Sequence, residues 1–100
     1  MPLNRLELSG RLLELGALRL TPAGAALEFK LMHESEQREA GGSRKVEAEI
    51  GAIAFEAEAR LIAGRPLGSE VKLQGFLSAK GKRSKKLVLH VTNVEFVEGA

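Results

Sequence analysis

Hydrophobic and polar residues alternate along several stretches of the chain, which is the pattern of strands with one buried face. From residue 6 to residue 12 every even position is leucine or glycine, and the odd positions are charged residues or serine. The alternation changes phase at Leu12 and Leu13. We therefore expect a bulge or sharp bend near Gly10 that keeps Leu13 and Leu15 in apolar contact, a device found in strongly curled sheets.

Two more strands are predicted in the first half of the chain. A Thr-Pro-Ala-Gly turn at residues 21–24 precedes an alternating segment at residues 27–32. Residues 34–45 contain no large apolar residue and include Gly-Gly-Ser, so we predict a flexible loop there. A third strand follows, and its inward positions are Val46, Ala48 and Ile50.

The period becomes helical over residues 54–63. Phe55, Ala59 and Ile62 fall on one face of such a helix. Gly64 and Pro66 follow as residues that end helices. We predict a short helix of about two to three turns.

Residues 71–97 predict a long hairpin. Its first strand alternates from residue 71, and its tip at residues 80–86 is basic. Its second strand carries Leu87, Leu89 and Val91 on one face. A second phase change near Asn93 turns Val94 and Phe96 inward.

The predicted elements are, in order, strand, strand, strand, short helix, strand and strand. This is the order of an all-β, five-stranded Greek-key OB-fold barrel whose short helix lies between the third and fourth strands. An SH3-like barrel is the chief alternative, but it places no helix at that point. We expect residues 1–100 to form a single OB-fold domain, because no repeat or linker divides the chain.

Composition agrees with a small globular domain. The chain has 100 residues, of which 44% are hydrophobic and 28% are charged. A chain this short has a thin core, which a subunit interface would help to stabilise. It contains no cysteine, which excludes disulfides and thiolate metal ligands. No apolar run is long enough for a membrane span and the start lacks a signal-peptide core, so we expect a soluble, cytoplasmic protein without membrane contact.

Few residues are available for catalysis. There is no aspartate, and the only histidines, His33 and His90, lie in predicted strands. Two histidines without cysteine do not form a typical zinc site, and the glycine-rich phosphate loop with its lysine is absent. We therefore expect no enzyme activity, no metal and no cofactor, and we expect both histidines to be satisfied by water or a neighbouring group.

The positive charge is concentrated in one place. The chain holds 15 Lys and Arg against 13 acids, a net charge of +2. Five of those bases lie in one run: Lys80, Lys82, Arg83, Lys85 and Lys86. Several cations on one hairpin tip can neutralise successive phosphates of a nucleic acid and release counterions. The alternative is a solvated tip that only raises solubility.

Other polar positions extend this candidate surface. Arg44 and Lys45 form a second, weaker basic pair, which is as readily explained as ordinary decoration of a strand edge. Lys30, Lys72 and Gln74 alternate outward and are candidates to line the same barrel face.

Aromatic residues for base stacking are few, because the chain has four Phe and neither Trp nor Tyr. Alternation places Phe29 in the core, Phe55 on the inner face of the helix and Phe96 inward. Phe76 falls with the polar positions of its strand, unless a bulge at Gly75 turns it inward, and it is the candidate stacking residue. Binding of a single strand would then depend mainly on electrostatics and weaken at high salt.

The chain resembles the PriB family of primosomal replication proteins over nearly its whole length. An ordered series of segments carries the resemblance: NRLELSG at 4–10, TPAG at 21–24, LMHES at 31–35, EQREAG at 36–41, VKLQGFLS at 71–78 and KLVLHVTNVE at 86–95. The family is in turn similar to bacterial single-stranded-DNA-binding proteins.

The resemblance implies an OB-fold homodimer that binds single-stranded DNA during replication restart. It also implies contact with the PriA helicase and handover to DnaT or the helicase loader. The family's DNA contacts correspond here to the run of five bases, and its basic residue at the opening of the third strand corresponds to Arg44. Where members carry aromatic residues, this chain has Gly42 and Glu47, so we expect a weaker or repositioned DNA site.

Two other functions stay open on these residues. The shortage of aromatic residues favours a protein–protein adaptor of the primosome whose DNA contact is weak. The same basic run would also serve an RNA-binding OB module.

Overall fold

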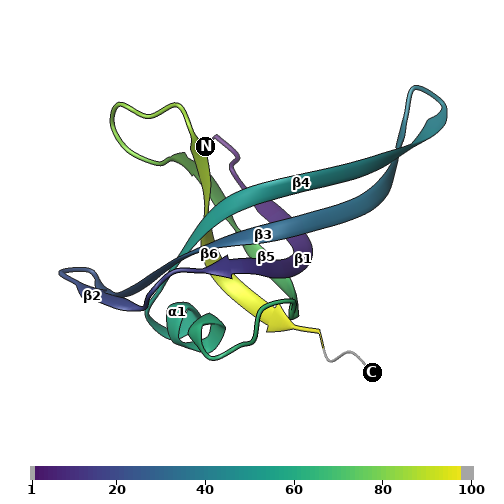
Figure 1. Cartoon of the computed structure of the whole chain (residues 1–100). Coiled ribbons are helices and arrows are strands. Elements are labelled where there is room, and N and C mark those ends of the chain that lie inside the picture. The colour runs from purple at the N-terminus through teal and green to yellow at the C-terminus, as the bar shows by residue number, and fades with distance from the viewer. Residues whose placement is uncertain (1, 98–100) are drawn as a thin grey trace.

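The computed structural model describes residues 2–97, which form a six-stranded sheet and one helix (Figure 1). The elements are β1 (Leu6–Leu15), β2 (Arg19–Thr21), β3 (Gly24–Glu39), β4 (Gly42–Phe55), α1 (Glu56–Ala63), β5 (Glu70–Ala79) and β6 (Leu87–Phe96). The predicted long hairpin with its basic tip is thus confirmed as β5, the turn at residues 80–86 and β6.

Five of these strands close into a barrel. They are hydrogen-bonded in the order β1-β5-β6-β4-β3, and β1 also pairs with β3, which joins the two ends of the sheet. All neighbours are antiparallel except β4 and β6, which run parallel where Ala52 faces Leu89 and Ala54 faces Val91. With α1 between β4 and β5, this is the predicted OB fold rather than an SH3-like barrel. The short β2, which alternation did not indicate, pairs only with β3.

β1 closes the barrel by pairing with two strands in succession. The segment from Leu6 to Arg11 pairs with β5, and the segment from Arg11 to Leu15 pairs with β3. The register shifts between Leu12 and Glu14, so Leu13 bulges outward and is 37% exposed while Leu12 is buried. The bulge therefore lies at Leu13 and not near Gly10. The prediction that Leu13 keeps inward contacts is wrong, because a bulged residue leaves the alternation.

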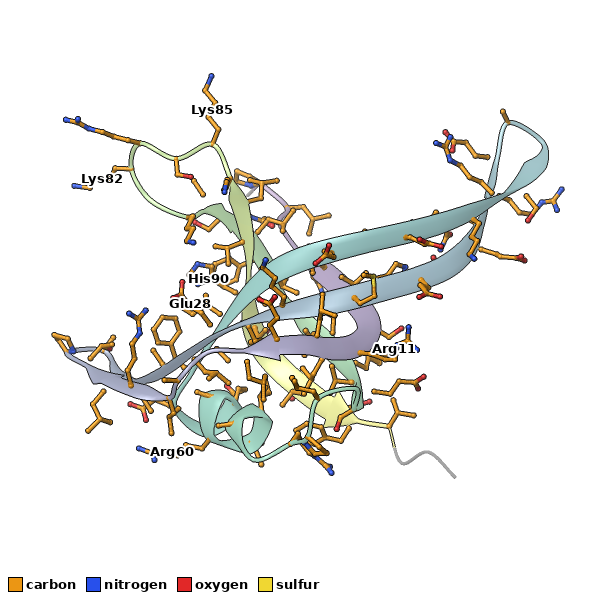
Figure 2. All side chains as sticks on the ribbon, in the orientation of Figure 1. Arg11, Glu28, Arg60, Lys82, Lys85 and His90 are labelled. Carbon is orange, nitrogen blue, oxygen red and sulfur yellow. The ribbon has the colours of Figure 1, made fainter. Side chains whose placement is uncertain are left out.

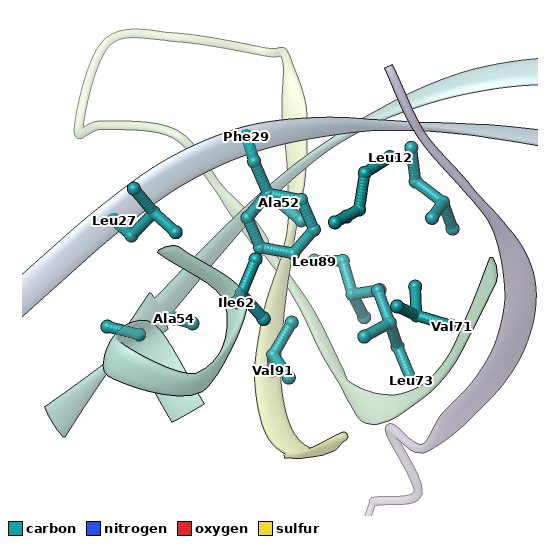
Figure 3. Close-up of a cluster of buried hydrophobic side chains, with 12 residues drawn as sticks. Leu12, Leu27, Phe29, Ala52, Ala54, Ile62, Val71, Leu73, Leu89 and Val91 are labelled. Atoms are coloured by element: carbon teal, nitrogen blue, oxygen red, sulfur yellow. The ribbon is translucent and has the colours of Figure 1, made fainter. Parts of the chain in front are cut away.

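The barrel interior is filled by aliphatic side chains and one aromatic ring. The buried cluster consists of Leu12, Leu27, Phe29, Leu31, Ala52, Ala54, Ala59, Ile62, Val71, Leu73, Leu89 and Val91 (Figure 3). α1 contributes Ala59 and Ile62, which confirms two of the three predicted inner positions. The third prediction, Phe55, is wrong: this residue precedes α1 in extended conformation and is only half-buried.

The predicted phase change in the last strand is confirmed at Thr92. Gln74 faces Asn93 and Gly75 faces Val91, so Thr92 is the extra residue of a bulge. Beyond it, Val94 and Phe96 pack against the core as expected. Leu87, which was expected on the inner face with Leu89, is 61% exposed because it pairs with Ala79 at the mouth of the hairpin.

The structure replaces the predicted flexible loop by a two-stranded arm, defined here as residues 34–47. β3 runs on to Glu39 and β4 begins at Gly42, so the two strands stay paired to the turn (Figure 1). Ala40 and Gly41 form that turn with φ angles of 52° and 82°, the signs required by a type I′ hairpin. The hydrogen bonds between the two strands join backbone atoms and need no apolar side chains. The polar residues of this segment therefore gave no alternation from which strands could be predicted.

The arm also corrects the predicted inner face of the third strand. Val46 and Ile50 are half-buried, but Ala48 is exposed, because β4 lies beyond the core over most of this segment.

The close approach of β5 and β6 at the bulge requires a glycine. A Cβ at Gly75 would overlap the carbonyl oxygen of His90, whereas a Cβ at Gly51 of β4 meets no atom within 4 Å. We expect Gly75→Ala to lower the free energy of unfolding by about 1–3 kcal/mol, the usual effect of overpacking. Gly51→Ala is the matched control and should not destabilise the protein. Urea unfolding followed by circular dichroism measures both, and equal stability of the two variants would contradict the packing described here.

Candidate nucleic-acid interface

Five cations lie on the turn between β5 and β6, called the basic loop from here on (residues 80–86). The loop is closed by a hydrogen bond from the Lys80 N–H to the Lys86 carbonyl oxygen (2.8 Å), and the Lys86 N–H donates to the Ser84 hydroxyl oxygen (3.1 Å). Figure 2 shows Lys82 and Lys85 directed away from the barrel. All five predicted bases are exposed, and none forms an ion pair within residues 2–97.

A groove of about 430 Å³ opens at the foot of the basic loop, against β3 and β4. The charged residues that line it are Lys30, Lys80, Lys86, Glu14 and Glu28. Lys30 Nζ lies 3.8 Å from a Glu14 carboxylate oxygen, and the Arg19 guanidinium lies 3.5 Å from a Glu28 carboxylate oxygen. Both carboxylates therefore already face a cation, and the lysines of the basic loop give the groove an excess of positive charge. The predicted position of Lys30 beside the basic loop is confirmed.

Arg44 and Lys45 lie on the arm and not beside the basic loop. In Figure 1 the tip of the arm lies at the upper right and the basic loop at the upper left, well apart from each other. The Arg44 guanidinium lies 3.2 Å from Glu39, and Lys45 Nζ lies 3.3 Å from Glu47. Each of these bases has a carboxylate partner on its own hairpin, so the arm offers less uncompensated positive charge than the basic loop.

Lys72 and Gln74 face β1 across the β1–β5 pair. Lys72 Nζ lies 3.4 Å from Glu7 Oε1. A hydrogen bond from Gln74 and the nearby Lys72 ammonium lower the pKa of the Glu7 carboxyl. Neither residue lines the groove at the basic loop, which includes Lys30.

The exposed aromatic residue is Phe76, as alternation predicts. It is 39% exposed, because the bulge lies on β6 and leaves the alternation of β5 intact. Its ring stacks on the His90 imidazole with centroids 5.0 Å apart and planes 12° apart. Phe55 stacks on the same imidazole at 6.3 Å. The alternation pattern did not associate His90 or Phe55 with Phe76. The predicted hairpin could have suggested that His90 lies opposite Phe76, but no local pattern indicated Phe55.

The two histidines have different surroundings. His33 Nδ1 lies 2.7 Å from the Ser9 carbonyl oxygen and Nε2 lies 2.8 Å from the Ser35 hydroxyl, so the prediction that a neighbouring group satisfies it is confirmed. His90 contacts the two phenylalanine rings instead. In the part of the chain that the structure describes, no three His, Cys, Asp or Glu residues gather in a way that would hold a metal ion. Nor does that part contain a helix of the length and apolarity needed to cross a membrane.

Comparison with known proteins places these features in a family. Residues 4–93 match a family model described as another single-strand binding protein family. The replication restart protein PriB of Bordetella pertussis is 50% identical over 99 residues, which cover 98% of this chain and 92% of that protein. The PriB of Nitrosomonas europaea is 41% identical and aligns with 94% of this chain and 88% of its own length.

Solved structures agree in fold. The priB protein of Ralstonia solanacearum superposes with a TM-score of 0.86 at 30% identity, over 97% of this chain and 100% of that one. An SSB from Plasmodium falciparum, in complex with single-stranded DNA, superposes with a TM-score of 0.70 over 98% of this chain and 97% of that one. Its identity is 18%, so that likeness concerns the fold alone.

Proposed function

This chain belongs to the PriB family of replication restart proteins, and on that premise we propose that it is a homodimer that binds single-stranded DNA without sequence specificity in primosome assembly and replication restart. The DNA phosphates lie on the basic loop and in the groove at its foot. The family's named contacts with the PriA helicase and with DnaT or the helicase loader belong to the same proposal.

The observation that carries the proposal is the uncompensated charge of the basic loop. Five exposed cations stand together without carboxylate partners in residues 2–97, while other bases of the barrel and arm are paired with glutamates. Each phosphate that such a cation neutralises releases counterions and adds about 0.7 to the log–log salt slope for a single strand. Five cations set an upper limit of about 3.5 for the contribution of the loop.

The basic loop and the arm offer a pair of variants with equal change in charge. We expect Lys82→Ala with Lys85→Ala to weaken binding of labelled oligo-dT and to reduce the magnitude of the salt slope by about 1.4, because two phosphate contacts are lost. Arg44→Ala with Lys45→Ala should have a much smaller effect, because each of these bases must first leave a glutamate. Fluorescence anisotropy over a salt series measures both.

Four outcomes of the titration and of a competition experiment contradict the proposal. Absence of binding, or binding that does not respond to salt, removes the electrostatic mechanism. Equal effects of the two double variants remove the assignment to the basic loop. Preference for an RNA oligonucleotide of the same length in competition favours the RNA-binding alternative.

The homodimer is supported by an open strand edge. One edge of β1 pairs with β5 from Leu6 to Arg11, and pairing of the other edge with β3 begins only at Arg11. In the described part of the chain no strand covers that other edge from Leu6 to Gly10, and His33 reaches it at the Ser9 carbonyl oxygen. An unpaired edge is a template for a second strand, and a two-fold axis would pair the β1 strands of two copies.

We expect sedimentation equilibrium at micromolar concentration to give twice the 10.8 kDa mass of one chain. The reason is that pairing of two open edges satisfies backbone groups that no strand of the same chain pairs with. A mass of 10.8 kDa at every concentration up to 100 µM or so would overturn the dimer proposal without affecting the proposal on DNA.

The arm favours a second role as a helicase contact. It extends beyond the barrel, carries four glutamates against three bases, and pairs two of those bases internally. A surface with this balance does not attract phosphate but can form complementary ion pairs with a protein. We therefore propose the arm as the surface of the adaptor alternative and the basic loop as the DNA contact.

The same double variants separate these two roles. We expect Arg44→Ala with Lys45→Ala to weaken capture of the purified PriA helicase in the presence of nuclease, because their removal changes the charge pattern of the arm. Lys82→Ala with Lys85→Ala should leave that capture unchanged. Loss of all capture upon nuclease treatment of the native proteins would show that DNA bridges them and would contradict a direct contact.

A further inference from the structure

Three aromatic rings form a stack on the outside of the barrel. Phe55 ends β4, His90 lies on β6 and Phe76 lies on β5, so the rings come from three neighbouring strands. The imidazole is in the middle, with centroid distances of 6.3 Å to Phe55 and 5.0 Å to Phe76. Both stacks are close to parallel, with interplanar angles of 26° and 12°.

The stack is accessible to solvent at its Phe76 end. Phe76 is 39% exposed, and within residues 2–97 the only ring that contacts it is that of His90. Unlike that of His33, the side chain of His90 makes no hydrogen bond or ion pair with another described residue. A planar ligand that stacks on Phe76 would extend the series of rings, and the imidazole nitrogens remain free to bind water or a polar edge.

The stack lies at the foot of the basic loop on both strands of the same hairpin. Phe76 precedes Lys80 by four residues, and His90 follows Lys86 by four residues. β5 ends at Ala79 and β6 begins at Leu87, so each ring lies three residues inside its strand from the start of the basic loop, a distance of about 10 Å. Figure 2 shows His90 on the strand that descends from the loop carrying Lys82 and Lys85. A few nucleotides of a single strand cover such a distance.

We propose that Phe76, His90 and Phe55 form a base-stacking platform for the strand whose phosphates are held by the basic loop. The inference rests on the proposed function and deepens it: the basic loop binds the phosphates of the strand, and the aromatic stack binds its bases. It also accounts for the absence of aromatic residues on the arm, where Gly42 and Glu47 stand. In this chain the rings that meet bases are placed on β5 and β6, next to the uncompensated cations.

Stacking and phosphate contacts have separable signatures. A stacked ring contributes to affinity at every salt concentration, releases few counterions, and needs the base rather than the backbone. The ligands of the experiment are therefore oligo-dT and an oligonucleotide of the same length whose residues are abasic. The variants are Phe76→Leu, which removes the ring but keeps an apolar side chain, and His90→Leu.

We expect Phe76→Leu and His90→Leu each to weaken oligo-dT binding about fivefold or more, with an unchanged salt slope. Neither should alter binding of the abasic strand. Phe76→Tyr and His90→Phe keep a ring at the same place and should bind oligo-dT like the native protein. Leu67→Ala is the control for loss of an exposed apolar side chain elsewhere, since Leu67 is 62% exposed and lies between α1 and β5.

Each failure identifies a different error. If the native protein does not bind oligo-dT, the proposed function fails. If it binds but the leucine variants bind equally well, or lose the same factor on abasic strands, the rings serve only the sheet and the platform is overturned. A leucine variant that shows no cooperative unfolding in circular dichroism is not folded, and the test then rests on Phe76→Tyr and His90→Phe, which keep a ring. Weakened binding of oligo-dT by these folded variants overturns the platform, and native-like binding supports it.

Discussion

Closure of the sheet by β1 is the constraint on which the remaining structure depends. A single ten-residue strand pairs first with β5 and then with β3, and the bulge at Leu13 lets it change partners. Closure also places Glu14 and Leu15 of β1 in the groove that Lys30 of β3 and Lys86 of the basic loop line. The two lysines are more than fifty residues apart in the chain, and the pairing of β4 with both β3 and β6 brings them to one groove.

Compensation of charge, rather than the number of charges, distinguishes the surfaces of the barrel. Lys30, Lys45 and Lys72 each lie within 4 Å of a glutamate oxygen, so their positive charge is partly cancelled locally. Such exposed pairs contribute little to stability. They do make these bases less available to bind the phosphates of a nucleic acid. The basic loop lacks these partners among the described residues, and so a chain with a net charge of only +2 still presents one strongly cationic place.

The two long hairpins of the barrel differ in how their charged residues are arranged. The β3–β4 hairpin grows into a polar arm that leaves the core, with only a two-residue turn at its end. The β5–β6 hairpin keeps its strands on the barrel and places its cations on a longer loop, and the stacked rings of Phe76 and His90 lie further along the same two strands. One hairpin thus offers paired charges on a projecting ribbon, and the other offers free charges next to rings.

The order of the five barrel strands and the helix, a phase change near Asn93, the buried Phe29 and the basic run between the last two strands were all indicated by the sequence alone, because they depend on local alternation and on runs of like charge. The arm was not predictable in this way, since Glu36 and Lys45 pair through backbone atoms that any residue supplies. The stack of Phe76, His90 and Phe55 was decided only by tertiary structure. Phe76 and His90 face each other across the β5–β6 hairpin, and Phe55 joins them because the parallel pairing of β4 with β6 sets its register. No local pattern encodes a register between distant strands.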